Sequence, residues 1–234
     1  MLELQHLSFS VEGKDIIQDI SAVIEDNGFT VITGPNGGGK STLAKLIMGI
    51  EKPTSGKILF NGIDITDMDI HERSRHKIGY AFQQPPRFKG MTVSDLLSIA
   101  HGTKLSEDHC CSYLSDVGLC SKDYLHREVD ASLSGGEVKR IEIATLLARD
   151  LQLAIFDEPE AGIDLWSFAK LVETFQNMQK KKQLSVILIS HQERIMQLAD
   201  TIMIIENGRV KHQGVKESVL PELMQEFDCR CCKE

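Results

Sequence analysis

The amino-acid sequence predicts an α/β fold with a mostly parallel sheet. Short apolar segments of strand length alternate with longer segments of helical period along most of the 234 residues. This alternation is typical of parallel sheets whose strands are joined by helices. In addition, a glycine-rich loop follows one buried strand and precedes a helix, as in folds that bind phosphate groups. A chain of this length buries enough surface to form a core without disulfides.

The first part of the chain is rich in strand patterns. Residues Leu2–Val11 alternate between apolar and polar side chains, and 16–24 form a second strand after a turn at 13–15. The short run Phe29–Thr33 leads into the glycine-rich loop, and a return strand is expected at 57–60. The helix after the loop places three apolar residues on its inner face: Leu43, Leu46 and Ile47.

The middle of the chain changes from strands to helices. A strand is expected at 78–82, and helical patterns follow it. The first of these helices starts after Thr92, whose hydroxyl is expected to cap it together with Asp95 three residues later. Further helices are expected at about 106–117 and 134–149.

The last part of the chain alternates strands and helices again. Continuous apolar runs at 151–156 and 184–189 predict strands buried on both faces. Residues 201–213 predict a closing hairpin around Asn207-Gly208, and a last amphipathic helix is expected at about 217–227. Five residues of the helix after position 164 are expected to face the core: Leu165, Phe168, Leu171, Val172 and Phe175.

The charge and hydropathy of the chain argue against several classes of function. With 26 basic and 34 acidic residues its formal charge is −8, so it lacks the basic field that attracts nucleic acid. No apolar run approaches the ~18 residues that span a bilayer, and the N-terminus resembles neither a signal nor a transit peptide. We therefore expect a cytoplasmic protein without direct membrane insertion, which another chain holds if it works at a membrane.

The cysteines say less about function than the charge does. There are six, and in a reducing compartment they are not expected to form disulfides. Three of them cluster near the end of the chain, as Cys229, Cys231 and Cys232. Two interpretations of this cluster stay open: a frayed tail without metal, or a site for a metal or an iron–sulfur intermediate that lacks a full ligand set.

Segment 34–42 carries the strongest chemical signal in the sequence. It fits the pattern G-x-x-x-x-G-K-S between a strand and a helix. Glycines let backbone N–H groups surround phosphate oxygens, and the helix N-terminus adds positive potential. Lys40 is expected to neutralise the β- and γ-phosphates of ATP, and Ser41 to supply an oxygen ligand to Mg²⁺. The expected nucleotide-binding residues are Gly34, Pro35, Asn36, Gly37, Gly38, Gly39, Lys40, Ser41 and Thr42.

Two acidic residues follow the buried strand at 151–156. Asp157 is expected to hold Mg²⁺, usually through water, and Glu158 to polarise the attacking water as general base. Paired acids at a strand end can also be ordinary surface charges. Downstream of a phosphate loop, however, they indicate ATP hydrolysis.

The segment Leu133-Ser134-Gly135-Gly136-Glu137 narrows the family, because a phosphate loop alone also fits kinases, GTPases and motors. It places a second set of backbone N–H groups at a helix start. With these motifs in this order, the chain resembles the ATP-binding-cassette (ABC) ATPases over nearly its whole length. The resemblance implies an ABC nucleotide-binding domain at 1–222 with an N-terminal antiparallel β subdomain, a helical subdomain inserted at about 84–150, and a tail at 223–234.

The same resemblance implies a composite site. In this family the signature segment of one subunit faces the phosphate loop of the other, so ATP is sandwiched in a homodimer. Ser134, Gly135, Gly136 and Glu137 are therefore expected at the partner subunit's nucleotide. Gln83 matches the glutamine that senses Mg²⁺ and water, Asp164 the aspartate that crosses the dimer interface, and His191 the histidine that contacts the γ-phosphate.

One position departs from the family pattern. Many cassettes carry an aromatic residue in the first strand region that stacks on adenine. Here the equivalent position is Val11, which predicts weak base stacking. Phe9 lies two residues earlier, so in a regular strand it shares a face with Val11 and is expected to substitute in part.

The residues after the signature distinguish types of cassette. Ordinary transporter cassettes continue Q-x-Q-R with an aliphatic run, whereas 137–143 read E-V-K-R-I-E-I. This segment is similar to the SufC type of ABC ATPase, which serves SUF iron–sulfur cluster assembly, in a divergent, minimal SufBC form. That resemblance implies a SufB-like scaffold as partner, contacting about 83–97 with Arg87 and Lys89 as candidate contacts. The alternative is the ATP-binding subunit of a membrane transporter, with a permease as partner.

Overall fold

The computed structural model describes residues 1–181, 184–221 and 223 of the chain. Its centre is a six-stranded sheet formed by β3 Phe29–Thr33, β6 Ile78–Ala81, β9 Leu153–Asp157, β10 Ser185–Ile189, β11 Thr201–Glu206 and β12 Arg209–Val215. The strand order is β12-β11-β3-β10-β9-β6. Neighbouring strands pair in parallel except at the β11–β12 hairpin, which confirms the predicted mostly parallel sheet.

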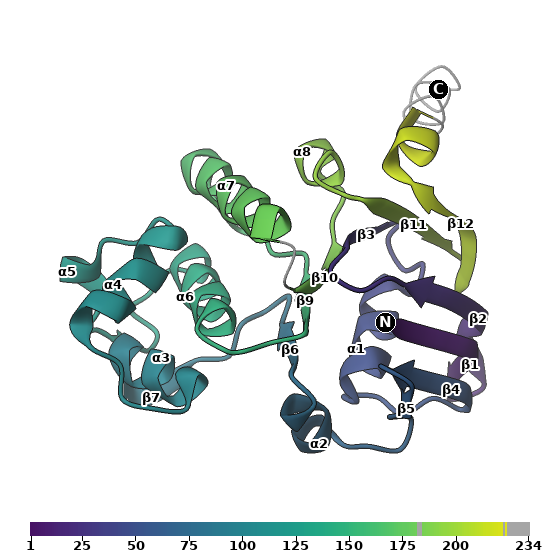
Figure 1. Ribbon diagram of the computed structural model, residues 1–234, viewed down its shortest axis with the longest axis horizontal. Helices are drawn as coiled ribbons and strands as arrows, with labels where there is room; N and C mark the ends of the chain where they lie inside the picture. The colour runs from purple at the N-terminus through teal and green to yellow at the C-terminus, as the bar shows by residue number, and fades with distance from the viewer. Residues whose placement is uncertain (182–183, 222, 224–234) are drawn as a thin grey trace.

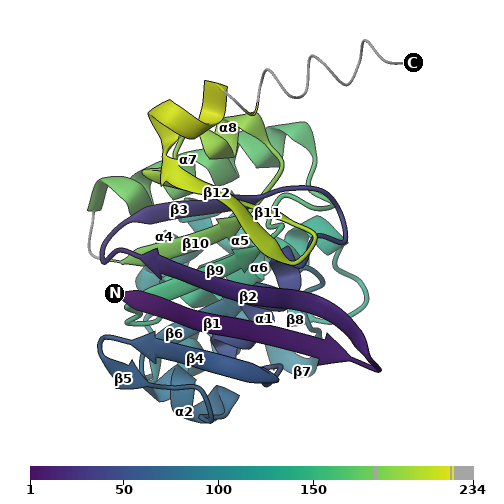
Figure 2. The same ribbon diagram turned by 90° about the vertical axis from the view of Figure 1, so that its right-hand side faces the viewer.

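A second, antiparallel sheet lies in front of the first (Figure 2). It consists of β1 Leu2–Val11, β2 Lys14–Ile24, β4 Ser55–Phe60 and β5 Ile63–Asp64, in the order β2-β1-β4-β5. All its pairs are antiparallel, as the resemblance to ABC ATPases implied. The helix α1 Lys40–Met48 packs between the two sheets, and its residues Leu43, Leu46 and Ile47 are completely buried, as expected.

The central sheet separates two hydrophobic cores, because successive side chains of a strand point to opposite faces. One core contains α1 and the antiparallel sheet, and the other contains the helices on the far face. Strand residues toward α1 are Ile32, Ile155 and Ile187. Strand residues toward the other helices are Val31, Phe156 and Leu188.

The chain between β6 and β9 stands apart from the sheets (Figure 1). It forms β7 Phe88–Thr92, α3 Val93–His101, α4 Glu107–Asp116, α5 Ser121–Tyr124, β8 Glu128–Val129 and α6 Gly135–Leu147. Thr92 caps α3 in a reciprocal box with Asp95, as predicted. Two further helices, α7 Leu165–Lys181 and α8 Glu193–Met196, cover the central sheet. No helix in the described part of the chain is both long and apolar enough to cross a bilayer.

Two expectations for the second half of the chain need correction. Leu165 was expected in the core, but it is 71% exposed and the neighbouring Trp166 is 87% exposed. Both lie in the first turn of α7, ahead of the buried residues Phe168, Leu171 and Phe175. Leu223, assigned to the tail, is buried in the core; the cysteine cluster at 229–232 lies outside the described residues.

A buried arginine holds the helix that follows the phosphate loop. Arg73, in α2 Ile70–Arg75, is completely buried, and no carboxylate accepts a hydrogen bond from it among the described residues. Its guanidinium donates to the carbonyl oxygens of Leu46 (2.6 Å) and Ile47 (2.9 Å), in the last turn of α1. It also donates to Met68 O and Thr66 O. Burial lowers the pKa of Arg73 to about 10, so it stays charged at neutral pH.

Replacing Arg73 tests this role. Lysine keeps the charge but cannot reach four carbonyl oxygens that lie around a planar guanidinium, so Arg73→Lys should lower the free energy of unfolding by about 2 kcal/mol or more. Urea denaturation followed by circular dichroism measures the change. The exposed Arg75 of the same helix supplies the control, since Arg75→Lys should change stability by less than about 0.5 kcal/mol. Equal unfolding midpoints for the two variants would contradict the assignment.

Candidate functional site

The phosphate loop joins β3 to α1 and forms one wall of a cavity of about 730 Å³. Gly34 has a φ of +133°, and a Cβ at this position would lie 2.0 Å from the carbonyl oxygen of Ile205 in β11. Only glycine therefore lets the loop leave β3 at this point. Gly208, in the β11–β12 turn, donates its N–H to Gly38 O at 3.0 Å and holds the other side of the loop.

Lys40 lies against the loop that precedes it. Its side chain is buried, and Nζ donates to Gly34 O at 2.8 Å and to Pro35 O at 2.9 Å. Burial lowers the pKa of Lys40, while the negative charges of Glu158 and Asp157 act in the opposite direction. The Lys40 ammonium therefore lies close enough to Glu158 and Asp157 to interact with both carboxylates electrostatically.

Asp157 occupies the end of β9, two strands away from β3. Its Oδ1 accepts a hydrogen bond from Ser41 Oγ at 2.9 Å, and its Oδ2 accepts one from Tyr80 OH at 2.8 Å. Burial and the charge of Asp157 raise the pKa of the Tyr80 phenol, so Tyr80 remains a donor at neutral pH. The structure thus brings together Ser41 and Asp157, both expected near Mg²⁺, and adds Tyr80, which no sequence motif marks.

Glu158 and Gln83 also meet at this cavity. Gln83 Nε2 donates to Glu158 Oε2 at 2.6 Å, although the two residues are far apart in the chain. Both line the cavity together with the phosphate loop. Glu158 has a φ of +45°, a conformation that non-glycine residues adopt at a cost of about 1–3 kcal/mol. The strand end therefore turns sharply here and aims the carboxylate at the loop.

His191 follows β10, the strand between β3 and β9. His191 is exposed. Both Lys40 and Glu158 act electrostatically on its imidazole, so the ring lies near the same charged groups as the phosphate loop. Partial burial, followed by the charge of Lys40, lowers its pKa below the ordinary value of 6.5. At neutral pH the ring is thus neutral, with one nitrogen as donor and one as acceptor.

The signature segment lies elsewhere in the same chain. Ser134 caps α6, its hydroxyl accepting from Glu137 N at 3.3 Å while Glu137 Oε2 accepts from Ser134 N at 2.6 Å. A hydrogen bond from Tyr124 OH, more than any other contact, lowers the pKa of Glu137 to about 2. Among the described residues that line the cavity, none comes from 134–137. Gly135 is exposed, and a Cβ at this position would meet no atom within 4 Å.

Asp164 has a local role that sequence analysis missed. Its Oδ1 accepts from the N–H groups of Trp166 and Ser167, each at 3.0 Å, and its Oδ2 accepts from Ser167 Oγ at 2.6 Å. Asp164 therefore caps α7, whose first turn carries the exposed Trp166. Gly162 lies next to the signature, since a Cβ on Gly136 would be 3.2 Å from Gly162 O.

The residues expected to contact the base lie differently from the expectation. Phe9 is buried in the core between the sheets, so it does not face a nucleotide beside Val11. The pairing of β1 with β2 shifts between Phe9 and Ser10, which breaks the regular alternation that the expectation assumed. Val11 is 44% exposed and is not among the described residues that line the cavity. Residues that do line it, without a sequence motif, are Lys14, Asp15, Ile16, Gln18, Asn207 and Gly208.

Comparison with known proteins places this geometry in a family. Residues 17–161 match the family model described as ABC transporter. The chain is 38% identical over 227 residues to an uncharacterized ABC transporter ATP-binding protein of Methanocaldococcus jannaschii, covering 94% of this chain and 90% of the relative. It is 30% identical to a probable branched-chain amino acid transport ATP-binding protein of Archaeoglobus fulgidus, covering 94% and 91%.

A solved structure agrees with these relatives. It is cbiO1 from Clostridium perfringens, described as part of the ABC transporter complex cbiONQ. The chain matches it with a TM-score of 0.77 at 29% identity, over 98% of this chain and 94% of that one. The descriptions of all three proteins name transport, and none of them names iron–sulfur cluster assembly.

Proposed function

This chain belongs to the ABC transporter family of ATP-binding proteins, and from that premise we propose that it is the ATP-hydrolysing subunit of a membrane transporter. The observation that carries the proposal is the convergence of three strand ends on one cavity. The phosphate loop follows β3, Asp157 ends β9 with Glu158 directly after it, and Gln83 follows β6. The names of the relatives support transport over the SufC-type role that 137–143 suggested.

The phosphate loop and Lys40 bind the phosphates of ATP. Backbone N–H groups between Gly34 and Thr42 donate to phosphate oxygens, and the buried Lys40 turns its ammonium from Gly34 O and Pro35 O to the β- and γ-phosphates. The lost pair of carbonyl hydrogen bonds is replaced by stronger contacts to charged oxygens. Val11 is not among the described residues that line the cavity, so contact with the base falls to Lys14, Ile16 and Gln18, which do line it.

The ligands proposed for Mg²⁺ fit that ion. Ser41 and Asp157 offer oxygen ligands and already contact each other. Gln83 has a carbonyl oxygen available for the ion, since its amide nitrogen donates to Glu158. When bound, the ion would neutralise negative charge that develops on the β- and γ-phosphates. Tyr80 keeps Asp157 oriented by donating to its second oxygen.

Glu158 acts as the general base. Its carboxylate accepts the proton of the attacking water, while Gln83, at 2.6 Å from it, orients the same water. His191, neutral at physiological pH, donates to the γ-phosphate and stabilises charge there. The proton of the attacking water thus moves to a carboxylate oxygen of Glu158.

The signature segment serves a second subunit. Ser134–Glu137 presents a capped helix start with Gly135 open to solvent, and none of it lines this chain's own cavity. A second copy therefore completes each site, with Asp164 and the exposed Trp166 at the contact between copies.

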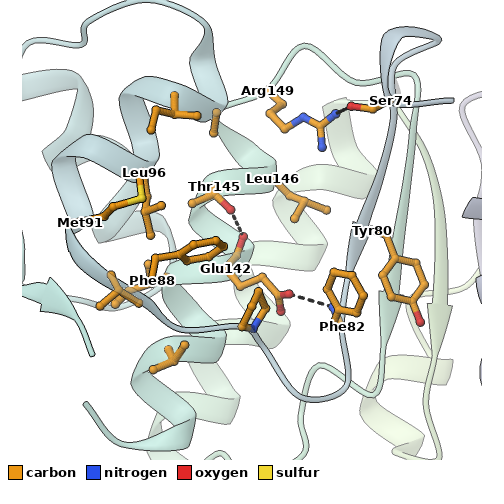
Figure 3. A pocket seen from close by; sticks show the side chains of 16 residues that line it. Ser74, Tyr80, Phe82, Phe88, Met91, Leu96, Glu142, Thr145, Leu146 and Arg149 are labelled. Carbon is orange, nitrogen blue, oxygen red and sulfur yellow. Dashed lines mark hydrogen bonds between the residues drawn. The ribbon is translucent and has the colours of Figure 1, made fainter. Parts of the chain in front are cut away.

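The groove lined by Phe82, the residue before Gln83 in the chain, is the proposed docking site for the permease (Figure 3). It has a volume of about 580 Å³ and an apolar lining that includes the exposed Phe82, Phe88 and Ile99. Arg87, a candidate contact, is exposed and also donates to Asp130 O and Leu133 O, so it braces the segment that precedes α6. Lys89 is exposed and remains a candidate contact. This location puts the partner next to Gln83.

The SufC-type role is the second candidate. It is favoured by Lys139 and Glu142, which stand where ordinary transporter cassettes carry glutamine and an aliphatic residue. In that case the same groove binds a soluble scaffold, and ATP-driven closure of two copies changes the scaffold's conformation.

The first test addresses catalysis. Glu158→Gln cannot accept the proton of the attacking water, so turnover should fall by about 10²–10⁴-fold while ATP binding persists. The variant should also accumulate an ATP-bound dimer. Trp166 is the sole tryptophan and sits beside Asp164, so its emission should shift to shorter wavelength when ATP is added to Glu158→Gln. Near-normal hydrolysis by this variant would refute the assignment of Glu158.

The second test addresses the composite site. Ser134→Arg should bind nucleotide but neither dimerise nor hydrolyse, and Lys40→Ala should bind ATP weakly. A mixture of the two variants should recover part of the activity, because a mixed dimer has one site with an intact Lys40 and an intact Ser134. Assayed under conditions where mixed dimers are detected by crosslinking, a mixture as inactive as its components would count against sharing between copies.

The third test addresses the partner. Affinity purification from detergent-solubilised membranes should recover a multi-span permease in stoichiometric amount. Ile99→Asp should reduce its recovery, since Ile99 lines the groove and is 65% exposed. The matched control is Val215→Asp, at a 58% exposed apolar residue on β12, which should leave recovery unchanged. Recovery of a soluble scaffold protein from cytosol, with no permease from membranes, would instead favour the second candidate.

A further inference from the structure

Two side chains of α6 hold the peptide groups on both sides of Phe82. Glu142 Oε1 accepts from Phe82 N–H at 2.9 Å, as the dashed line in Figure 3 marks. Lys139 Nζ donates to Phe82 O, and it also lies 3.4 Å from Asp157 O. Lys139 and Glu142 are one helical turn apart, so a single turn of α6 holds both polar groups of one residue.

Lys139 and Glu142 form an ion pair that is almost completely buried. Lys139 is 1% exposed, and the side chain of Glu142 is 10% exposed at 3.5 Å from the ammonium. Burial raises the pKa of Glu142 to about 7 against the charge of Lys139, and burial lowers the pKa of Lys139. Removing two charges from water costs free energy that an apolar pair would not incur. A stability role alone therefore does not explain the pair.

Several carboxylate oxygens lie near Lys139 without a hydrogen bond from its ammonium. Within the described residues, the buried side-chain atoms without a hydrogen-bond partner are Glu142 Oε2 and Glu160 Oε2. Asp157 and Glu160 both act electrostatically on Lys139 from the end of β9 and the segment after it. Tyr80 in β6 interacts electrostatically with Glu142, and both line the same groove as Arg149. The Lys139 ammonium thus donates to Phe82 O, while the carboxylates of Glu142, Asp157 and Glu160 interact with it electrostatically.

The residue that follows Phe82 is Gln83, which contacts Glu158. The same helix that holds Phe82 begins at the signature Ser134. We propose that Lys139 and Glu142 are positioning residues that fix Gln83 against Glu158 and connect the signature helix to the general base. This inference rests on the proposed ATP hydrolysis at the cavity.

The connection has a direct mechanical consequence. When the signature engages the nucleotide of a second copy, any shift of α6 is transmitted through two hydrogen bonds to the Phe82 peptide groups. Gln83 then moves with Phe82, so the general base of one site responds to occupancy of the other. Small errors of position matter here, since displacement by about 1 Å can cost about 100-fold in rate.

The experiment replaces both charges together, because removing only one would leave the other buried and unpaired. Lys139→Met combined with Glu142→Leu keeps the side-chain volumes similar and removes the contacts to Phe82. Its kcat should fall about 10- to 100-fold, while its KM for ATP stays within about twofold of the parent, since the phosphate loop is untouched. Circular dichroism melting verifies that the variant is folded.

A matched control comes from α7. Lys170 and Glu173 have the same spacing and lie 2.8 Å apart, but both are substantially exposed. Lys170→Met with Glu173→Leu should leave kcat within about twofold. If the buried double variant does not fold, the single variants decide: Glu142→Gln retains an acceptor for Phe82 N–H and should keep far more activity than Glu142→Leu. An unchanged kcat in the double variant, or equal activity of the two single variants, overturns the proposal.

The outcome also separates this inference from the proposed function. The parent protein and Glu158→Gln are assayed in parallel. If the parent hydrolyses ATP, Glu158→Gln does not, and the double variant matches the parent, then ATP hydrolysis stands and the positioning role fails. If the parent and Glu158→Gln have equal rates, the catalytic assignment itself fails.

Discussion

The hydrogen bond between Ser41 and Asp157 joins two parts of the chain on which the rest of the site depends. Ser41 belongs to the helix after β3, and Asp157 ends β9, with β10 between these strands. Because parallel strands end at the same edge of a sheet, the topology alone brings the phosphate loop, the two acids and the residue after β10 together. The signature segment lies at the start of α6, in the helical part of the chain between β6 and β9. Under the proposed function, a single copy would hold the residues for hydrolysis, and a second copy would supply the remaining phosphate contacts.

Much of the fold could be predicted because its signals are local. A capping hydroxyl, a glycine-rich turn or a continuous apolar run specifies a helix start, a loop or a buried strand within a few residues. The Thr92 cap and the strand Phe29–Thr33 were predicted this way. The failures at Phe9 and Leu165 have equally local causes: a shift in strand pairing and a helix that begins before the core does. Neither leaves a mark in the hydrophobic pattern.

In the candidate site, too, some residues could be predicted from local motifs and others could not. Motifs identified Lys40, Asp157 and Glu158, because phosphate chemistry demands those residue types at fixed spacing. Tyr80, Arg87 and the Phe82 contacts could not be predicted, since each depends on side chains meeting across long sequence separations. The choice between permease and scaffold depends on the groove, whose shape comes from the fold and whose lining follows no motif. Similarity to named transporters weighs more here than one divergent segment after the signature.

The arginine that holds the end of α1 also limits how the sequence can change. Gly49 ends that helix with a φ of +80°, and a Cβ there would lie 2.8 Å from Arg73 Nε and 3.1 Å from Met68 O. Any larger residue at position 49 would displace the guanidinium that the helix end requires, and a shorter residue at position 73 would leave its carbonyl oxygens without donors. Glycine at position 49 is therefore required wherever arginine occupies position 73. In homologous sequences Gly49 and Arg73 should be inherited as a pair.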